Sequence, residues 1–126
     1  MLLLGIGLIL VFCIGAYLVF NVTSSLTQAR KNNVIVIDCR SQSEWDKGHV
    51  SIGEVLHIPL GELKDSKKLP KDKATPIMIH CAAGARSARG KIILESLGYT
   101  DVANTVNVKV TEAALEAAET FKLHDS

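Results

Sequence analysis

A single cysteine followed by small residues and an arginine is the part of this sequence best suited to chemistry. Residues 80–90 read HCAAGARSARG, and Cys81 stands between an apolar run and a segment with helical spacing. At such a junction the unpaired backbone N–H groups and the positive end of the helix both favour an anion. The sequence therefore predicts that Cys81 is a nucleophile whose pKa is lowered.

The residues after the cysteine are of the types that such a site needs. Ala82, Ala83 and Ala85 carry small side chains, which lets backbone amides come close to the sulfur. Gly84 permits a turn that other residues disfavour. Arg86 adds a fixed cation that can pair with an oxyanion. We therefore expect this loop to bind the substrate; a buried structural cysteine before a helix is the alternative.

The spacing of the cysteine and the arginine separates two chemistries. Cysteine phosphatases and some arsenate reductases use Cys-x5-Arg to wrap a tetrahedral oxyanion. Here only four residues, 82–85, separate Cys81 from Arg86. The shorter loop fits a smaller adduct, such as one sulfur atom on the cysteine, and leaves oxyanion chemistry as a third hypothesis.

The other cysteines do not suggest a metal site. The three cysteines are Cys13, Cys39 and Cys81, and none of them forms a Cys-x-x-Cys pair. Such a sparse, odd set indicates neither a disulfide framework nor zinc. We expect Cys13 and Cys39 to be structural and no metal to be bound, with a Cys39–Cys81 bridge left open.

Four apolar runs in the second part of the chain predict the strands that position the loop. They cover residues 34–38, 55–60, 76–80 and 101–106. Continuous β-branched runs are typical of strands buried on both faces, as in parallel sheets. Alternation of strands with helical segments predicts an α/β domain, in which ligand sites gather at the carboxyl ends of the strands.

Two helices are expected beside these strands. Residues 86–97 have helical spacing, with an apolar side formed by Ala88, Ile92 and the Leu94–Leu97 side, and Gly98 provides the stop. Thr111 is expected to cap a final helix.

The N-terminal segment has a different character. Residues 1–20 contain no charged side chain, and the first charge is that of Arg30. Because about 20 apolar residues can cross a bilayer, we predict a transmembrane anchor, or an uncleaved signal segment, over residues 1–20. A cleaved signal peptide is the alternative. A linker over 21–32 and the catalytic domain over 33–126 follow. The positive-inside tendency places the domain in the cytoplasm, with the periplasm left open.

Charge argues against one class of partner. The chain has 14 basic and 13 acidic residues and a formal net charge of +1. Nucleic-acid binding needs a concentrated basic surface, so no nucleic-acid partner is expected.

Three motifs in the right order resemble the rhodanese family of sulfurtransferases. VIDCRSQSEWDKGHV is similar to the family's opening strand with Asp-x-Arg and Gly-His. HIPLGEL is similar to its Ile-Pro-Leu segment, and IHCAAGARSARGKIILESLGYTDV to its active loop, helix and exit. The resemblance implies a rhodanese-like fold, a mostly parallel sheet flanked by helices.

The resemblance also implies a thiosulfate sulfurtransferase. Cys81 would take a sulfane sulfur from thiosulfate or a similar donor, become a persulfide and pass the sulfur to a thiol or to cyanide, with no cofactor. Asp38 and Arg40 match Asp-x-Arg and are expected to give structural support, Arg40 by pairing with Glu44. Trp45 is expected to pack in the core.

Two departures from the family pattern keep another hypothesis open. Ala82 stands where many members have a polar residue, and NTVNVKV, 104–110, replaces a glycine-rich turn that helps to wall the site. The alternative is a membrane-tethered rhodanese module that docks on a partner protein, or receives sulfur from it, with little activity on thiosulfate.

Overall fold

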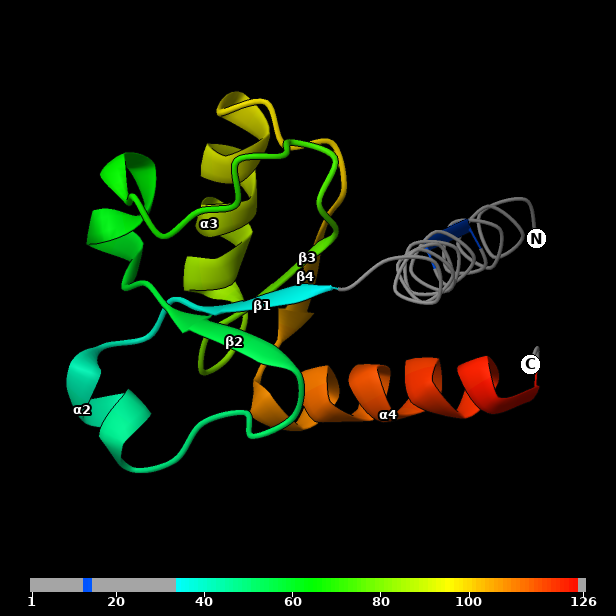
Figure 1. The fold of residues 1–126 in the computed structure, drawn as a ribbon. Coiled ribbons are helices and arrows are strands. Elements are labelled where there is room, and N and C mark those ends of the chain that lie inside the picture. Colours follow the sequence, from blue (N-terminus) through cyan, green and yellow to red (C-terminus); the bar gives the residue numbers. More distant parts are fainter. Residues whose placement is uncertain (1–12, 15–33, 125–126) are drawn as a thin grey trace, which may run out of the picture.

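The computed structural model describes residues 13–14 and 34–124 (Figure 1). The elements in chain order are β1 (Ile35–Asp38), α2 (Gln42–Asp46), β2 (Glu54–His57), the 3-10 helix η1 (Leu60–Asp65), β3 (Ile77–His80), α3 (Ala85–Ser96), β4 (Val102–Val106) and α4 (Val108–His124).

The four strands form one parallel sheet in the order β2-β1-β3-β4. Helix α3 and η1 lie on one face of the sheet, and α4 lies on the other (Figure 1). In the register, Asp38 at the end of β1 pairs with His80 at the end of β3. The residues that follow these two strands therefore lie beside each other at the carboxyl edge of the sheet, as predicted for an α/β domain.

Alternate residues of the central strands serve the two faces. Ile37 and Ile79 point into the cluster under α3 and η1, which also contains Leu94 and Leu63. Val36 and Met78 point to the opposite side, where Leu115 and Ala118 of α4 cover them. Because both faces are covered, residues 34–37 and 76–79 are apolar without a break, and the two strand predictions, which end at Asp38 and His80, are confirmed.

The position of the predicted helix α3 is confirmed, but its buried side differs in part from the predicted one. The helix ends as expected: Gly98 adopts a φ of +99°, its N–H bonds to Glu95, and the N–H of Tyr99 bonds to Leu94. The predicted apolar side is confirmed in part: Leu94 is fully buried, whereas Ile92 is 68% exposed and Ala88 is exposed as well.

The buried side of α3 consists of Ser87, Gly90 and Leu94. A Cβ at Gly90 would lie 2.5 Å from the Cδ1 of Ile79. The buried side therefore combines an apolar anchor, Leu94, with the smallest residue, Gly90, which lets the helix approach β3 closely.

The expected cap of the last helix is also wrong. Helix α4 begins at Val108, and the Asn107 side chain accepts a hydrogen bond from Val110 N at 2.9 Å. Thr111 lies inside the helix, fully buried, and its hydroxyl bonds to Asn107 O and to the Thr105 hydroxyl. Asn107 thus takes the capping role.

Helix α2 follows the first strand and was not predicted. Its N-cap, Ser41, forms a capping box with Glu44. Trp45 is only half-buried, and its ring stacks on His49 and His57 at centroid distances of 3.6 and 4.8 Å. The prediction that Trp45 lies in the core is therefore wrong.

The predicted membrane anchor falls almost entirely outside the described residues. Among residues 13–14 and 34–124, no helix is both long and apolar enough to span a bilayer.

Candidate active site

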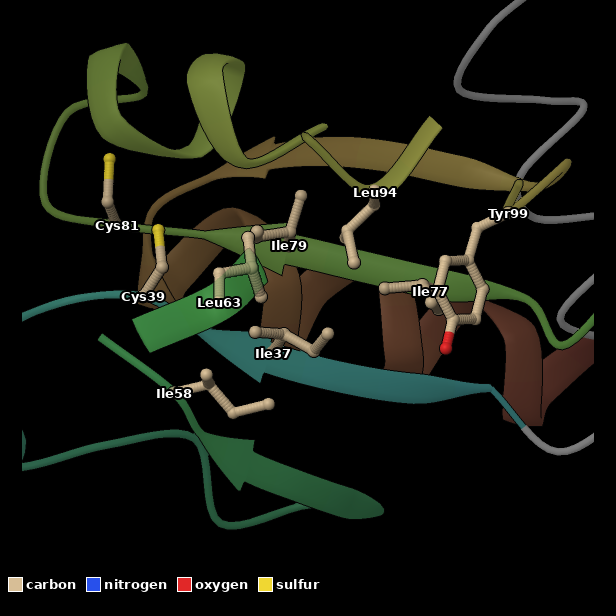
Figure 2. Packing of buried hydrophobic residues seen from close by; sticks show 9 residues of the cluster. All are labelled: Ile37, Cys39, Ile58, Leu63, Ile77, Ile79, Cys81, Leu94 and Tyr99. Atoms are coloured by element: carbon tan, nitrogen blue, oxygen red, sulfur yellow. The ribbon is translucent and has the colours of Figure 1, made fainter. Parts of the chain in front are cut away.

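Cys81 lies where β3 ends and the loop to α3 begins. Its residue surface is 1% exposed, and its sulfur lies at the carboxyl end of the cluster under α3 (Figure 2). The strand sets this position because its preceding residues are wholly buried between the two helical layers. The predicted position of Cys81, between a strand and a helix, is confirmed. Backbone N–H groups that follow it in the chain contact its sulfur.

Three hydrogen-bonding groups surround the Cys81 sulfur. The backbone N–H of Gly84 donates to Sγ at 3.0 Å, and that of Ser87 does so at 3.4 Å. The Ser87 hydroxyl lies 3.3 Å from Sγ. Burial raises the pKa of the Cys81 thiol, but the bonds from Ser87 and from the amides of Ala83 and Gly84 outweigh it and lower the pKa to about 7.

The loop has the small side chains and the glycine turn that were expected. Gly84 adopts a φ of +100°, in the left-handed region that favours glycine, and α3 begins at Ala85. Ala82, Ala83 and Ala85 are exposed. Their predicted role in binding a substrate stays a prediction.

Two further residues fix the loop and were missed in the sequence. Ser87 is fully buried, and its hydroxyl lies 2.7 Å from Asn104 Oδ1, so that this oxygen and Cys81 Sγ compete for the single hydroxyl hydrogen. Asn104 Nδ2 donates to Gly84 O at 3.2 Å, and Oδ1 also accepts the N–H of Val106 at 3.0 Å. Two features of the sequence could have indicated these residues. One is a serine six positions after Cys81, and the other is a polar residue, Asn104, in an apolar strand.

The segment that departs from the family pattern contacts this loop. Val106 O accepts the N–H of Cys81 at 3.2 Å. Val106 has a φ of +69°, an uncommon conformation for a β-branched residue. Its Cγ1 would lie 3.3 Å from a Cβ placed at Gly84. A glycine at position 84 is thus favoured both by its own backbone and by this neighbour.

Arg86 does not point a free guanidinium at the loop. Nη1 donates to Glu44 Oε1 at 2.7 Å and Nη2 donates to Oε2 at 2.9 Å, linking α3 to α2. The expected pairing of Arg40 with Glu44 is therefore wrong. Glu44 lies beside Arg86 because the turn of α2 carries it across the end of the sheet, which spacing along the chain does not reveal.

Arg40 pairs instead with the residue two positions before it. Its Nη2 donates to Asp38 Oδ2 at 2.7 Å and to Gly48 O at 2.8 Å, and its Nε contacts both carboxylate oxygens. Burial raises the pKa of Asp38, but the bonds from Arg40 outweigh it and the pKa is lowered. His80, fully buried, lies 3.8 Å from the same carboxylate. These contacts of Asp38 and Arg40 are consistent with the structural role expected of them at the edge of the sheet.

Cys39 occupies the position beside the nucleophile on the neighbouring strand. It is a free thiol, as is Cys81, and its Sγ donates to His80 O at 3.3 Å. Burial raises the pKa of Cys39 to about 12, and a smaller effect of Cys81 acts in the same direction. The two sulfurs therefore differ in reactivity. Within the described part of the chain, no group of three His, Cys, Asp or Glu side chains is placed to hold a metal ion.

A family comparison agrees with this arrangement. The model of the rhodanese-like domain matches residues 23–107, which include all four strands and the loop after Cys81. The chain belongs to the rhodanese-like family.

Two curated rhodanese relatives are similar over part of the chain. Thiosulfate sulfurtransferase PspE of Escherichia coli is 35% identical over 75 residues, which cover 58% of this chain and 69% of the relative. Thiosulfate sulfurtransferase 18 of Arabidopsis thaliana is 32% identical over 79 residues, covering 54% and 58%.

Solved rhodanese structures have the same fold. A rhodanese with anions from E. coli has a TM-score of 0.53 and 30% identity, over 61% of this chain and 89% of that one. A rhodanese-like domain protein from Staphylococcus aureus has a TM-score of 0.54 and 26% identity, over 64% and 76%. The predicted α/β rhodanese fold is confirmed for the described domain.

Proposed function

We propose that this rhodanese-family protein is a sulfurtransferase that carries sulfur as a persulfide on Cys81. The observation that carries the proposal is the pair of backbone N–H groups that donate to Sγ, those of Gly84 at 3.0 Å and Ser87 at 3.4 Å, with the Ser87 hydroxyl 3.3 Å away. Such donors stabilise a thiolate, which is the nucleophilic form of cysteine. The relatives named thiosulfate sulfurtransferase support the same chemistry.

The first half-reaction forms the persulfide. The Cys81 thiolate attacks the outer sulfur of thiosulfate or of a similar sulfane donor. A sulfur–sulfur bond forms at Cys81, the donor's sulfur–sulfur bond breaks, and sulfite leaves with the electron pair when the donor is thiosulfate. The negative charge then lies on the new outer sulfur, within the loop of residues 82–86.

The second half-reaction returns the enzyme to its starting state. A thiolate or cyanide attacks the outer sulfur, the bond to Cys81 breaks, and Cys81 leaves as the stabilised thiolate. The low pKa of about 7 favours this departure, because a less basic thiolate is a better leaving group. No metal or organic cofactor takes part in the proposed reaction.

Intact mass of the full chain after incubation with thiosulfate tests the proposal. We expect a gain of one sulfur atom that cyanide removes and that Cys81→Ala abolishes. Cys39→Ala is the matched control and should still gain the sulfur. A folded chain with a free Cys81 thiol that gains no sulfur would contradict the thiosulfate reaction. That result would favour a module that receives sulfur from a partner protein.

We further propose that residues 1–20 anchor the protein in a membrane as a single span, with the catalytic domain in the cytoplasm. The support is the absence of charge before Arg30. Fractionation should place the full chain with membranes, resistant to high salt and released by detergent. A reporter fused after Ser126 that is active only in the periplasm would reverse the orientation.

A further inference from the structure

Arg86, whose charge acts on Cys81, is already paired with a carboxylate. Arg86 and Glu44 form two parallel N–H···O bonds of 2.7 and 2.9 Å between α3 and α2. Bidentate pairs of this kind are among the stronger hydrogen-bonded ion pairs. The guanidinium therefore presents little uncompensated charge to an anion that approaches Cys81.

The carboxylate is held in this position from its other side. Ser41 N and Ser41 Oγ both donate to Glu44 Oε1, at 3.3 and 3.0 Å, as part of the capping box of α2. The bond from Arg86 is the main reason that the pKa of Glu44 is lowered to about 2. Glu44 thus stays ionised at any working pH and cannot release Arg86 by taking up a proton.

A second arginine near Arg86 is also paired. Arg40 is bound to Asp38. The exposed loop residues are Ala82, Ala83 and Ala85. A doubly charged donor such as thiosulfate meets an apolar rim and must compete with Glu44 for Arg86.

We propose that Glu44 is a specificity-determining residue that selects against dianionic sulfur donors, and that the preferred donor is sulfane sulfur carried on a thiol. This inference rests on the proposed sulfurtransferase function. A persulfide brings its sulfur with at most one negative charge near the reacting atom. Neutralisation of Arg86 by Glu44 therefore weakens the attraction of a persulfide to the site less than it weakens that of thiosulfate. Glu44 acts through Arg86 and not on the sulfur itself.

Alkylation of Cys81 by two reagents of different charge tests the proposal without any sulfur transfer. Iodoacetate and iodoacetamide react by the same displacement, so the ratio of their rates cancels the thiolate fraction. Both rates are followed by mass on the tryptic peptide of residues 74–86. In Glu44→Gln we expect the iodoacetate-to-iodoacetamide ratio to rise at least threefold, because Arg86 then presents a net charge. Glutamine also suits the capping box, so α2 should keep its structure.

Glu95→Gln is the matched control. Glu95 is exposed near the far end of α3, the helix that carries Arg86, and its substitution changes the net charge of the chain by the same amount. We expect it to leave the ratio unchanged. An unchanged ratio in Glu44→Gln, or an equal rise in Glu95→Gln, would overturn the proposal even if the chain is an active sulfurtransferase.

Salt dependence provides a second measurement on the unmodified chain. If Arg86 is neutralised, the reagent ratio should change little between low salt and high salt. A steep fall of the ratio with added salt would show a free cation at the site and would contradict the role of Glu44. In turnover assays, Glu44→Gln should lower KM for thiosulfate with kcat unchanged.

Discussion

Cys39 and Cys81 follow adjacent strands, yet the protein gives them opposite acidities. Both are 1% exposed, so burial opposes ionisation in each. Cys81 receives two backbone N–H bonds, whereas the Cys39 thiol donates to the carbonyl of His80. The pKa is lowered to about 7 for Cys81 and raised to about 12 for Cys39. Donors at the sulfur, and not exposure, determine which cysteine reacts.

The first prediction at the residue scale concerns pH. Because the pKa of Cys81 is lowered, its thiolate forms as pH rises through about 7, well below the ordinary value for a thiol. Only the thiolate reacts, so the rate of Cys81 alkylation by iodoacetamide should rise between about pH 6 and 8 and then level off. Cys39 should stay unmodified over this range. A midpoint near the ordinary thiol pKa would contradict the described loop.

The second residue-scale prediction concerns Ser87. Ser87→Ala removes the hydroxyl that lies 3.3 Å from Sγ but keeps the backbone N–H. Loss of one hydrogen bond to a charged group should raise the pKa of Cys81 by about one unit and slow alkylation at pH 7 about fivefold. The pH profile of the variant measures this shift. Ser96→Ala, on an exposed position of the same helix, is the control and should show no shift.

At the scale of elements, α3 depends on close contact with β3. Gly90 lies on its buried side, and a Cβ there would come within 2.5 Å of Ile79 Cδ1 and 3.3 Å of Leu63 Cδ2. The helix can therefore present the Cys81 loop only at this short distance from the sheet.

Gly90→Ala tests this contact. The added methyl group must displace Ile79, so we expect the free energy of unfolding to fall by about 1–3 kcal/mol, although alanine favours helix formation. Urea unfolding measures the change. Arg89→Ala is the exposed control at the neighbouring position and should stay within about 0.5 kcal/mol of the unmodified chain. A Gly90→Ala variant that is as stable as the parent would contradict the packing described.

At the scale of the whole molecule, a buried ionic pair at the carboxyl end of β1 lies beside His80 at the end of β3. Asp38 is fully buried and bound to Arg40, and its pKa is lowered by those bonds despite the opposing effect of burial. His80 lies beside it, and burial lowers its pKa. Both shifts mean that the unfolded chain binds more protons than the folded one as the pH falls.

Acid should therefore destabilise the protein in two ranges. His80 contributes a loss of stability below its unfolded pKa of about 6.5, and Asp38 a further loss as the pH falls below about 4. Urea unfolding between pH 7 and pH 3 measures both slopes. Asp38→Asn should reduce the acid-range slope and leave the part due to Glu44, whose pKa is also lowered, to about 2. It should also lower stability at pH 7 by about 3–5 kcal/mol, because Arg40 is left buried without its partner. Asp46→Asn, an exposed change of the same kind, should do neither.

The sequence by itself determined the two central strands and indicated Cys81 as the candidate nucleophile. Residues 34–37 and 76–79 are apolar because two helical layers cover them, and a pattern of this kind is visible along the chain. Cys81 could be found because its site is local: the strand, the cysteine, the glycine turn and the helix follow one another without a break. Gly98 ended its helix as predicted for the same local reason.

Only the tertiary structure decided which groups complete the site. Arg86 meets Glu44 across 42 positions, and Ser87 meets Asn104 across 17. Arg40 turns to Asp38 and leaves Glu44 to Arg86. Such partners depend on how strands and helices stack at the edge of the sheet. The periodicity of the chain determines which residues are buried, but packing in three dimensions determines which charge neutralises which.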